Sequence, residues 1–338
     1  MTLLLSDKDV HALLPMNECI DVMATALTAV TTGNAVLPLR TIIRLPDSVN
    51  AFGTMPAVLG AGSRASIGAK IITVFPGNDA TPFDSHIGVV LLFDAEHGSL
   101  LAIADASSIT AIRTSAVSGL ATRLLANPEA RELAILGAGV LALPHIDAVC
   151  AVRPIERVRI WTRSGAGAGG RAQQLAERAR TRHAGIEVVV CESVRDAVDG
   201  ADVVCTITSS RTPVLEGAWL SAGTHVNAVG ASLPFARELD SDAVMRARLY
   251  VDRRESALAE AGDYLVPRSE GLITDAHIVG ELGELALGTI PGRASVTEIT
   301  LFKSLGLAVE DVAALRHIYT RARETGAGIS VELGGLRD

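Results

Sequence analysis

The sequence predicts an α/β fold in two parts, one organised on a parallel sheet and the other of α+β type. Its 338 residues, 49% of them hydrophobic, can bury a sizeable core, and this length suits two domains better than one. From Leu133 onward, short apolar runs alternate with longer helical patterns, which is the rhythm of an α/β domain. Residues 1–120 instead combine an amphipathic helix with several β-branched runs, which is typical of an α+β unit.

The N-terminal part is expected to begin with a helix that Asn17 caps and that ends at Gly33-Asn34, because its apolar stripe runs through Ile20, Met23, Ala24 and Leu27. Strands are predicted at 40–45, 67–74, 87–93 and 100–104, with a hairpin turn at Glu96-His97-Gly98. A helix of small residues over 108–125 then leads into the second part. A last helix, 309–323, is expected to return to the first.

The second part is predicted to contain a parallel sheet. Its expected strands are 133–136, 158–161, 186–190, 203–206, 225–229 and 249–251. Parallel strands need long crossover connections, and helical spacing supplies them over 140–152, 171–182, 193–198 and 241–246.

Composition narrows the class of partner. The formal net charge of -8 argues against a nucleic-acid-binding or anionic-membrane surface, because both require clustered positive charge. The N-terminus lacks the basic and apolar regions of a signal peptide, and no stretch approaches about 18 uninterrupted apolar residues. We therefore expect a cytoplasmic protein with small-molecule partners and no nucleic-acid or membrane partner. The cysteines show no CxxC spacing and are expected to be buried free thiols: Cys19, Cys150, Cys191 and Cys205.

Two glycine-rich turns compete for the role of a dinucleotide-binding turn. Such a turn must lie between a strand and a helix, where backbone N–H groups can bind pyrophosphate. The first, 137–142, directly follows a strand, and its expected cofactor contacts are Gly137, Gly139, Val140 and Leu141. The second, 165–170, is separated from its strand by Thr162-Arg163-Ser164. We favour the first turn, which makes this part a Rossmann-type NAD(P)-binding domain, and expect the second to be a flexible connection.

The residue after the second strand predicts which dinucleotide is bound. An acidic residue at this point would accept hydrogen bonds from the ribose of NAD, whereas an arginine suits the 2'-phosphate of NADP. Arg163 occupies this point, and Ser164 can add a hydroxyl, so NADP(H) is the expected cofactor and NAD(H) the alternative. If the second glycine turn bound the pyrophosphate instead, Glu192 would become the ribose ligand and NAD would be expected.

Several separated segments match one known family. They are Phe75-Pro76-Gly77-Asn78 with Ser85-His86, Ile109-Thr110-Ala111-Ile112-Arg113-Thr114, the Gly137 turn, Asn227-Ala228-Val229-Gly230-Ala231-Ser232, Arg237-Glu238-Leu239-Asp240, and Phe302-Lys303-Ser304-Leu305-Gly306 with Val309-Glu310-Asp311. Along nearly its whole length the chain resembles the ornithine cyclodeaminase/mu-crystallin family. The resemblance implies a nicotinamide-dependent enzyme and a homodimer joined through the N-terminal unit. It also implies a substrate-binding and dimerisation domain, 1–117 with 305–338, and a Rossmann NADP-binding domain, 118–304.

The resemblance also implies three substrate-binding cations at Arg40, Lys70 and Arg113. Arginine can bind a carboxylate through two hydrogen bonds, and lysine can orient or protonate a nearby nitrogen. Arg113 is additionally expected to contact the cofactor. At Ser232 the cyclodeaminases carry a catalytic aspartate, and a serine offers no such base near neutral pH. The ketimine reductase branch of the family shares this serine.

Further cofactor contacts are expected at Ser85 and His86, although His86 can equally be a partly buried, hydrogen-bonded histidine. The end of the fourth strand and the other matching segments add Thr206, Ile207, Thr208, Val229 and Ser304. Leu141 and Leu143-Pro144 replace more polar residues, so weaker side-chain contacts to the cofactor are expected. Asp202 and Glu310-Asp311 are expected to cap or hold helices, and no metal site is predicted because His145 and His225 lack ligand spacing.

These expectations lead to one hypothesis and two alternatives. The resemblance and Arg163 favour NADPH-dependent reduction of a C=N bond in a small 2-imino carboxylate, with amino or imino acids as substrate. The first alternative is an ornithine or lysine cyclodeaminase that recycles NAD, which Ser232 opposes. The second is a non-catalytic, NADPH-dependent binder of small ligands, which the presence of Lys70 opposes.

Overall fold

A computed structural model describes residues 1–165, 167 and 169–335. The chain divides into two compact units, one formed by residues 1–113 with 306–338 and the other by residues 114–305. Helix α3 (Ala106–Leu125) begins in the first unit and continues into the second.

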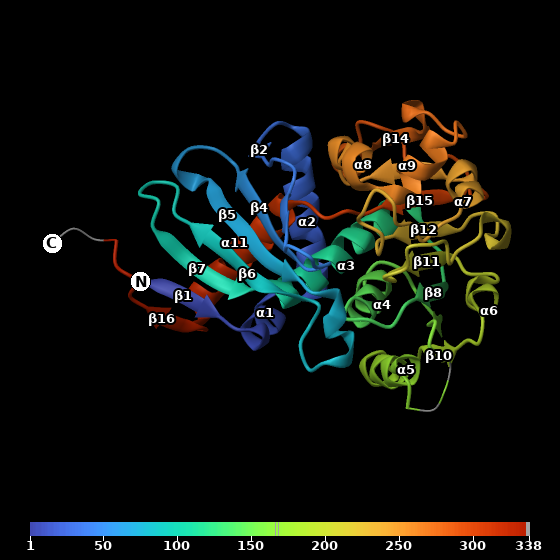
Figure 1. Cartoon of the computed structure of the whole chain (residues 1–338), viewed down its shortest axis with the longest axis horizontal. Helices are drawn as coiled ribbons and strands as arrows, with labels where there is room; N and C mark the ends of the chain where they lie inside the picture. The colour runs from blue at the N-terminus through green and yellow to red at the C-terminus, as the bar shows by residue number, and fades with distance from the viewer. Residues whose placement is uncertain (166, 168, 336–338) are drawn as a thin grey trace. The chain divides into compact units, whose positions relative to one another are not determined.

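The first unit contains an eight-stranded mixed sheet. Its strand order is β16-β1-β7-β6-β5-β4-β2, and β3 also pairs with β4. The strands are β1 (Thr2–Leu5), β2 (Ala35–Val36), β3 (Thr41–Arg44), β4 (Ala51–Leu59), β5 (Ser66–Val74), β6 (His86–Phe93), β7 (Leu100–Asp105) and β16 (Ile329–Val331). Helix α11 (Ala308–Thr325) crosses one face of this sheet, and α2 (Met16–Thr31) packs beside it (Figure 1). Helix α1 (Asp7–Leu13) completes the unit, with 3-10 turns η1 (Gly62–Arg64) and η2 (Pro76–Ala80).

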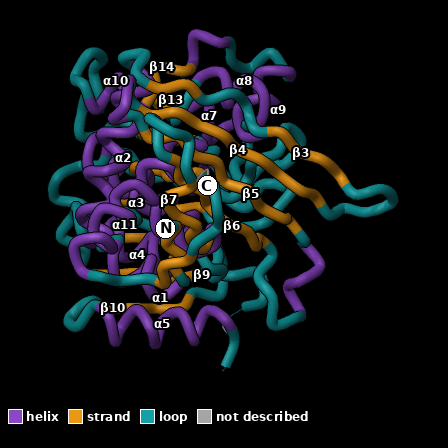
Figure 2. Tube along the Cα trace, turned by 90° about the vertical axis from the view of Figure 1, so that its left-hand side faces the viewer, coloured by secondary structure: helices purple, strands orange, loops and turns teal. Residues whose placement is uncertain are grey.

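The predicted strands and the predicted return of the last helix are confirmed in this unit. The unit does not begin with the predicted helix, because β1 and α1 precede it, and strands β2 and β16 were also not predicted. Helix α2 begins at Met16, and Pro15 stands at its N-cap without a side-chain cap, so Asn17 lies inside the first turn. Strand β4 was not predicted, because Gly53 and Pro56 disfavour strands. Pro56 is tolerated because it lies between the stretch of β4 that pairs with β3 and the stretch that pairs with β2. The β3–β4 hairpin extends as a long ribbon in Figure 2.

The second unit is a doubly wound Rossmann-type fold whose eight strands are all parallel, in the order β10-β9-β8-β11-β12-β15-β13-β14. The strands are β8 (Glu132–Leu136), β9 (Arg157–Trp161), β10 (Glu187–Val190), β11 (Val203–Thr206), β12 (His225–Ala228), β13 (Arg248–Val251), β14 (Ile278–Glu281) and β15 (Thr300–Lys303). The six predicted strands are confirmed, whereas β14 and β15 were missed. Strand β15 inserts between β12 and β13.

The helices of this unit cover both faces of the parallel sheet. They are α4 (Ala142–Cys150), α5 (Arg171–Arg182), α6 (Val194–Val198), α7 (Ser241–Arg246), α8 (Arg254–Glu260), α9 (Gly262–Ser269) and α10 (Leu282–Ala286), with 3-10 turns η3 (Gly217–Trp219) and η4 (Asp275–His277). Helix α5 runs along the edge strand β10 (Figure 2). Strand β8 shows how both cores form: Leu133 and Ile135 join one apolar cluster, and Ala134 and Leu136 join the other.

Within the described residues, no single helix has the length and apolar character needed to cross a membrane. Only the pair α1 and α2, bent by 85° at their junction, meets both criteria when taken together.

Candidate functional site

A cluster of buried charges joins the sheet of the first unit to two helices. Lys70 extends from β5, Arg113 from α3, and Glu310 and Asp311 from the first turn of α11. The Lys70 Nζ lies 2.9 Å from Asp311 Oδ2, the Arg113 Nε lies 2.9 Å from Asp311 Oδ1, and the Arg113 guanidinium lies 2.8 Å from Glu310 Oε2. Asp311 therefore bridges two of the three cations predicted for the substrate.

Local sequence explains how the helix reaches these cations. Alternate residues of β5 face α11, so Ser66, Gly68, Lys70 and Ile72 are buried there. A Cβ atom at Gly68 would lie 2.9 Å from the Val312 side chain and 2.5 Å from a carbonyl oxygen of the neighbouring strand. The missing side chain lets the first turn of α11 press against β5, which brings Asp311 to Lys70.

Glu310 and Asp311 correct a prediction. They were expected to cap or hold a helix, but no side chain caps α11, whose N-cap is Leu307. Both carboxylates are fully buried, and they point to the cations instead because a buried cation needs an opposite charge. Asp202 was likewise expected to cap or hold a helix, but it stabilises the start of strand β8. Its carboxylate accepts hydrogen bonds from the backbone N–H groups of Arg131 and Glu132.

Burial and charge set the protonation of this cluster. Burial lowers the pKa of Lys70 to about 8, and the attraction of Asp311 only partly opposes this because Arg113 also repels the ammonium. For Asp311, burial alone would raise the pKa, but the positive charges of Arg113 and Lys70 outweigh burial and the pKa is lowered. Lys70 is therefore an ammonium at neutral pH that gives up its proton more readily than an ordinary lysine.

The third predicted cation, Arg40, precedes β3 and donates a hydrogen bond to the carbonyl oxygen of Gly306 at 3.1 Å. Gly306 has a φ of +77°, and a Cβ atom there would lie 2.4 Å from the Arg113 guanidinium. Gly306 thus contacts two of the predicted substrate-binding arginines, a role that the sequence analysis missed. The Lys70 ammonium also donates to the Thr110 hydroxyl at 3.4 Å.

Ser85 and His86 lie at the start of β6 in the same unit. The Ser85 hydroxyl is 2.9 Å from His86 Nδ1, and the His86 carbonyl accepts a hydrogen bond from Ser107. The pKa of His86 is lowered, mainly because the ring is partly shielded from water and secondly because the positive charge of Lys70 repels a proton there. The residue as a whole is nevertheless exposed.

In the second unit the Gly137 turn lies between β8 and α4. Gly137 has a φ of +121°, and a Cβ atom there would lie 2.8 Å from the carbonyl oxygen of Ile207. Only glycine fits this conformation and this close approach to the end of β11. A Cβ atom at Gly139 would meet nothing within 4 Å, so the turn leaves open space in front of the helix start. Strands β8 and β11 adjoin at the switch point of the sheet, where α/β folds bind ligands.

Several other residues predicted for the cofactor lie at the start of α4 or at the ends of β11, β12 and β15. Val140 is exposed and Leu141 is the N-cap of α4, while Thr206, Ile207 and Val229 are buried at the ends of β11 and β12. Ser304 is buried after β15, and its N–H donates to the Ala228 carbonyl at 3.0 Å.

Arg163 and Ser164 follow β9, as predicted. Arg163 donates a hydrogen bond to the Ser210 hydroxyl at 2.8 Å, and Ser164 pairs with Thr162 at 3.0 Å. The rival turn, 165–170, lies between β9 and α5, but Ala166 and Ala168 fall outside the described residues, so its expected character stays a prediction.

Three buried charges beneath the ends of β11, β12 and β15 were not predicted as a group. Glu238 accepts hydrogen bonds from the Thr206 hydroxyl at 2.9 Å, the Thr208 N–H at 2.6 Å and the Gly230 N–H at 2.6 Å. Asp263 and Lys303 form an ion pair of 2.9 Å beside it. The matching segments contain Glu238 and Lys303, which was the only signal in the sequence.

The buried histidines of this unit are structural. His145 contacts the hydroxyls of Ser115 and Ser118, and burial lowers its pKa to about 4. His225 contacts Thr300 and Asn227, and burial lowers its pKa to about 3. Across the part of the chain that the structure describes, no group of three or more histidine, cysteine or acidic side chains has metal-binding geometry.

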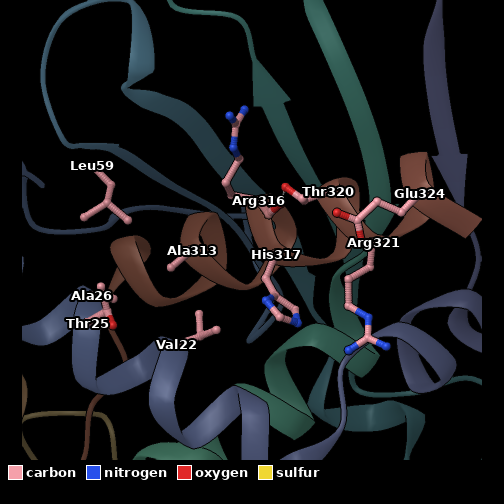
Figure 3. Close-up of a pocket in the computed structure, with 10 residues that line it drawn as sticks. All are labelled: Val22, Thr25, Ala26, Leu59, Ala313, Arg316, His317, Thr320, Arg321 and Glu324. Carbon is pink, nitrogen blue, oxygen red and sulfur yellow. Dashed lines mark hydrogen bonds between the residues drawn. The ribbon is translucent and has the colours of Figure 1, made fainter.

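A cavity of about 460 Å³ lies elsewhere in the first unit, between α2 and α11. In Figure 3, His317 and Arg321 extend from α11 toward α2, whereas Arg316 points the other way. None of the predicted site residues lines this cavity. It carries no part of the proposed chemistry.

Comparisons with known proteins identify one family over nearly the whole chain. The family model for the ornithine cyclodeaminase/mu-crystallin family matches residues 1–326. A mouse protein named ketimine reductase mu-crystallin is 42% identical over 287 residues, which is 85% of each chain. The Thermococcus litoralis delta(1)-pyrroline-2-carboxylate reductase, solved with NADH and L-proline, is 38% identical with a TM-score of 0.92, covering 98% of this chain and 100% of its own. An archaeal alanine dehydrogenase dimer with bound NAD is 30% identical with a TM-score of 0.90, covering 98% and 99%. The chain belongs to the ornithine cyclodeaminase/mu-crystallin family.

Proposed function

We propose that this protein reduces the C=N bond of a small 2-imino carboxylate with NADPH. The observation that carries the proposal is the buried Lys70 ammonium, whose pKa near 8 lies close to neutral pH and which is held by a carboxylate beside a buried arginine. Relatives named for reduction of a ketimine and of pyrroline-2-carboxylate support the same reaction.

In the proposed reaction, Lys70 orients the imine nitrogen and protonates it. A protonated imine accepts a hydride more readily, because its carbon carries more positive charge. Arg40 and Arg113 bind the substrate carboxylate, for which their planar guanidinium groups are suited. Asp311 holds Lys70 and Arg113 in place before substrate arrives, so part of the ordering is completed in advance.

The dinucleotide is proposed to bind at the Gly137 turn. The open space at Gly139 and the backbone N–H groups at the start of α4 fit a pyrophosphate. When bound, the nicotinamide supplies the hydride. Ile207, Thr208 and Val229 would line the site from the ends of β11 and β12, with Val140, Leu141 and Ser304 as further contacts. Ser85, His86 and Arg113 are also proposed to contact the cofactor.

We further propose that NADPH is preferred to NADH. The solved relatives carry NADH and NAD, so the preference rests on this chain's own Arg163 and Ser164 after β9. Arg163→Asp would replace the partner of a 2'-phosphate with an acceptor for a ribose hydroxyl. The ratio of kcat/KM with NADPH to kcat/KM with NADH is expected to fall at least ten-fold in this variant. An unchanged ratio would contradict the preference.

A homodimer joined through the first unit is also proposed. On the sheet face that α11 does not cover, most outward residues are apolar and only half-buried or exposed, among them Phe52, Ile67, Ile71, Ile87 and Leu91, although Thr54 and Thr73 lie on the same face. One solvated face of a mixed sheet would ordinarily carry polar residues. A second copy covering this face explains the pattern, and the alanine dehydrogenase relative is named as a dimer.

The state of the cysteines bears on the cellular compartment that we propose for the protein. The four cysteines are free thiols, with Cys19, Cys191 and Cys205 buried and Cys150 half-buried. Free thiols suit a reducing compartment, and we propose a cytoplasmic location.

The decisive experiment follows NADPH oxidation with five- and six-membered cyclic 2-imino carboxylates, and separately with 2-oxo acids plus ammonia. Turnover is expected with at least one imine, and Lys70→Met should remove it while Lys8→Met, which alters an exposed lysine, should not. Absence of turnover with every compound would refute the proposal. Ammonia release from ornithine or lysine without net change in the cofactor would establish the cyclodeaminase alternative, which Ser232 disfavours because it lacks a carboxylate. Ligand and NADPH binding without turnover would establish a binder.

A further inference from the structure

Glu238 is a fully buried carboxylate that joins two loops carrying predicted cofactor contacts. One oxygen accepts from the Thr208 N–H at 2.6 Å, and the other accepts from the Thr206 hydroxyl at 2.9 Å and the Gly230 N–H at 2.6 Å. Thr206 ends β11, Thr208 lies in the loop after it, and Gly230 lies in the loop after β12. One side chain thus bonds to the chain beyond two neighbouring strands.

The backbone of Glu238 is itself anchored. Its N–H donates to Asp263 Oδ1 at 2.8 Å, and its carbonyl oxygen accepts from the N–H groups of Val214 and Leu215 at 2.7 and 2.9 Å. The other oxygen of Asp263 lies 2.9 Å from the Lys303 ammonium. Because its own position is fixed by α9 and by the 214–215 segment, Glu238 can impose a position on the two loops.

The loops are also in direct contact at a point that glycine alone permits. A Cβ atom at Gly230 would lie 2.0 Å from the Thr208 carbonyl oxygen and 2.7 Å from a carboxylate oxygen of Glu238. The Gly230 N–H is shared between Glu238 at 2.6 Å and the Thr206 carbonyl oxygen at 3.2 Å. The Thr208 and Gly230 N–H groups donate to different oxygens of Glu238, so an amide at this position would place its NH2 group against one of them, while the Thr206 hydroxyl can either donate or accept.

We propose that Glu238 is a positioning residue that fixes the loops after β11 and β12 for dinucleotide binding. This inference rests on the proposed function. Glu238 needs to touch neither cofactor nor substrate, since it acts through Thr206, Thr208 and Gly230. Glu238→Gln keeps the shape but places an NH2 group against at least one of three donors, so one loop must move.

The test compares wild type, Glu238→Gln and Thr206→Val. Glu177→Gln serves as the control because Glu177 is exposed on α5 and also loses one negative charge. Nicotinamide fluorescence titration with NADH should give a Kd at least ten-fold higher for Glu238→Gln and two- to five-fold higher for Thr206→Val, with Glu177→Gln equal to wild type. A double variant that combines Glu238→Gln with Thr206→Val should bind NADH no more weakly than Glu238→Gln alone, because both changes remove the same contact.

Hydrogen exchange supplies a readout that does not depend on the cofactor. The amides of Thr208 and Gly230 should exchange faster in Glu238→Gln, while those of β8 and β11 keep their protection. Exchange at wild-type rates, or independent and additive effects in the double variant, would overturn the proposal. If wild type bound no dinucleotide but the exchange result held, the proposed function would fail while the loop-fixing role stood. If Glu238→Gln did not fold, hydrogen exchange would be measured in Thr206→Val instead. Faster exchange of the Thr208 and Gly230 amides in that variant would support the proposal, and wild-type rates would overturn it.

A pH profile separates a charged positioning residue from a merely structural one. The charged groups that face Glu238 are Asp263 of α9 and Lys303 of β15, and burial followed by repulsion from Asp263 raises the pKa of Glu238. Protonation at acid pH would turn an acceptor into a donor, so the wild-type Kd for NADH should rise as pH falls. NADH is the probe because it lacks a titrating 2'-phosphate. Glu238→Gln should lack this rise, and an identical pH dependence in both proteins would contradict the role.

Discussion

Replacing Asp311 with asparagine removes the charge that holds two buried cations. Asp311 is fully buried, 2.9 Å from the Lys70 ammonium and 2.9 Å from the Arg113 guanidinium. Breaking a buried ion pair by removing one partner destabilises a protein by about 3–5 kcal/mol. Glu310 still pairs with Arg113, so we expect a loss near the lower limit, about 3 kcal/mol. The melting temperature should fall by roughly 4 °C, because the entropy of unfolding is about 2.1 cal/mol/K per residue over 338 residues.

The assay is thermal unfolding, with Glu324→Gln as the matched control. Glu324 lies on the same helix α11, is exposed, and loses the same charge on substitution. Its variant should melt within about 1 °C of wild type, since surface charges contribute little. If Asp311→Asn also melted within that margin, the reasoning from buried charge would be refuted. The variant should in addition lower the pKa of Lys70 further, because a neighbouring negative charge is lost.

Three further outcomes are expected. The kcat/KM for imine reduction should fall as pH rises through the Lys70 pKa of about 8, because the proton donor is lost; a flat profile between pH 7 and 9.5 would exclude Lys70 as that donor. Gly137→Ala should weaken dinucleotide binding and lower the melting temperature, because its Cβ would meet the Ile207 carbonyl. Gly139→Ala should weaken dinucleotide binding without lowering the melting temperature, because its Cβ would meet nothing. Equal melting temperatures for the two variants would contradict this. Burial lowers the pKa of His145 in the folded protein to about 4. Between pH 6.5 and pH 4 the unfolded chain therefore binds a proton that the folded protein does not, and the free energy of unfolding falls as the pH is lowered, by about 2 kcal/mol at pH 5. Urea midpoints at pH 7.5 and pH 5 should show a smaller difference in His145→Asn than in wild type, and an equal difference would exclude His145 as the source.

Elements set by local patterns were predictable from the sequence. The strands around the Gly137 turn each carry an apolar run bounded by polar or glycine residues, and their predicted bounds lie within one residue of the observed ones. The turn itself requires a positive φ and a close approach, both of which glycine signals directly. Strand β15 could not be placed by such rules, because its position between β12 and β13 depends on a crossover that returns from the far edge of the sheet.

Ion pairs between residues far apart in the chain could not be predicted from the sequence. Arg113 and Asp311 are 198 positions apart, and nothing near either residue indicates the partner. Two consecutive acids in the first turn of a helix ordinarily complement its dipole, which is why Glu310 and Asp311 were assigned to helix ends. Their burial, decided by the glycine at position 68 on the opposing strand, is what redirects them to the cations.

The energetics of Lys70 argue that its cluster serves chemistry more than stability. A lysine whose pKa falls from 10.5 to about 8 on folding weakens the folded state by about 3 kcal/mol wherever it is protonated. That penalty is fully present below pH 8 and is relieved as pH rises toward 10.5, since the unfolded chain then no longer binds an extra proton. Replacing a buried ion pair with well-packed apolar residues is often neutral or stabilising, so packing alone would favour an apolar side chain at this position of β5. The ammonium stays in the core at this expense, held beside Arg113 by a carboxylate, where it can donate a proton near neutral pH. A donor of that strength is what an imine needs before it accepts a hydride.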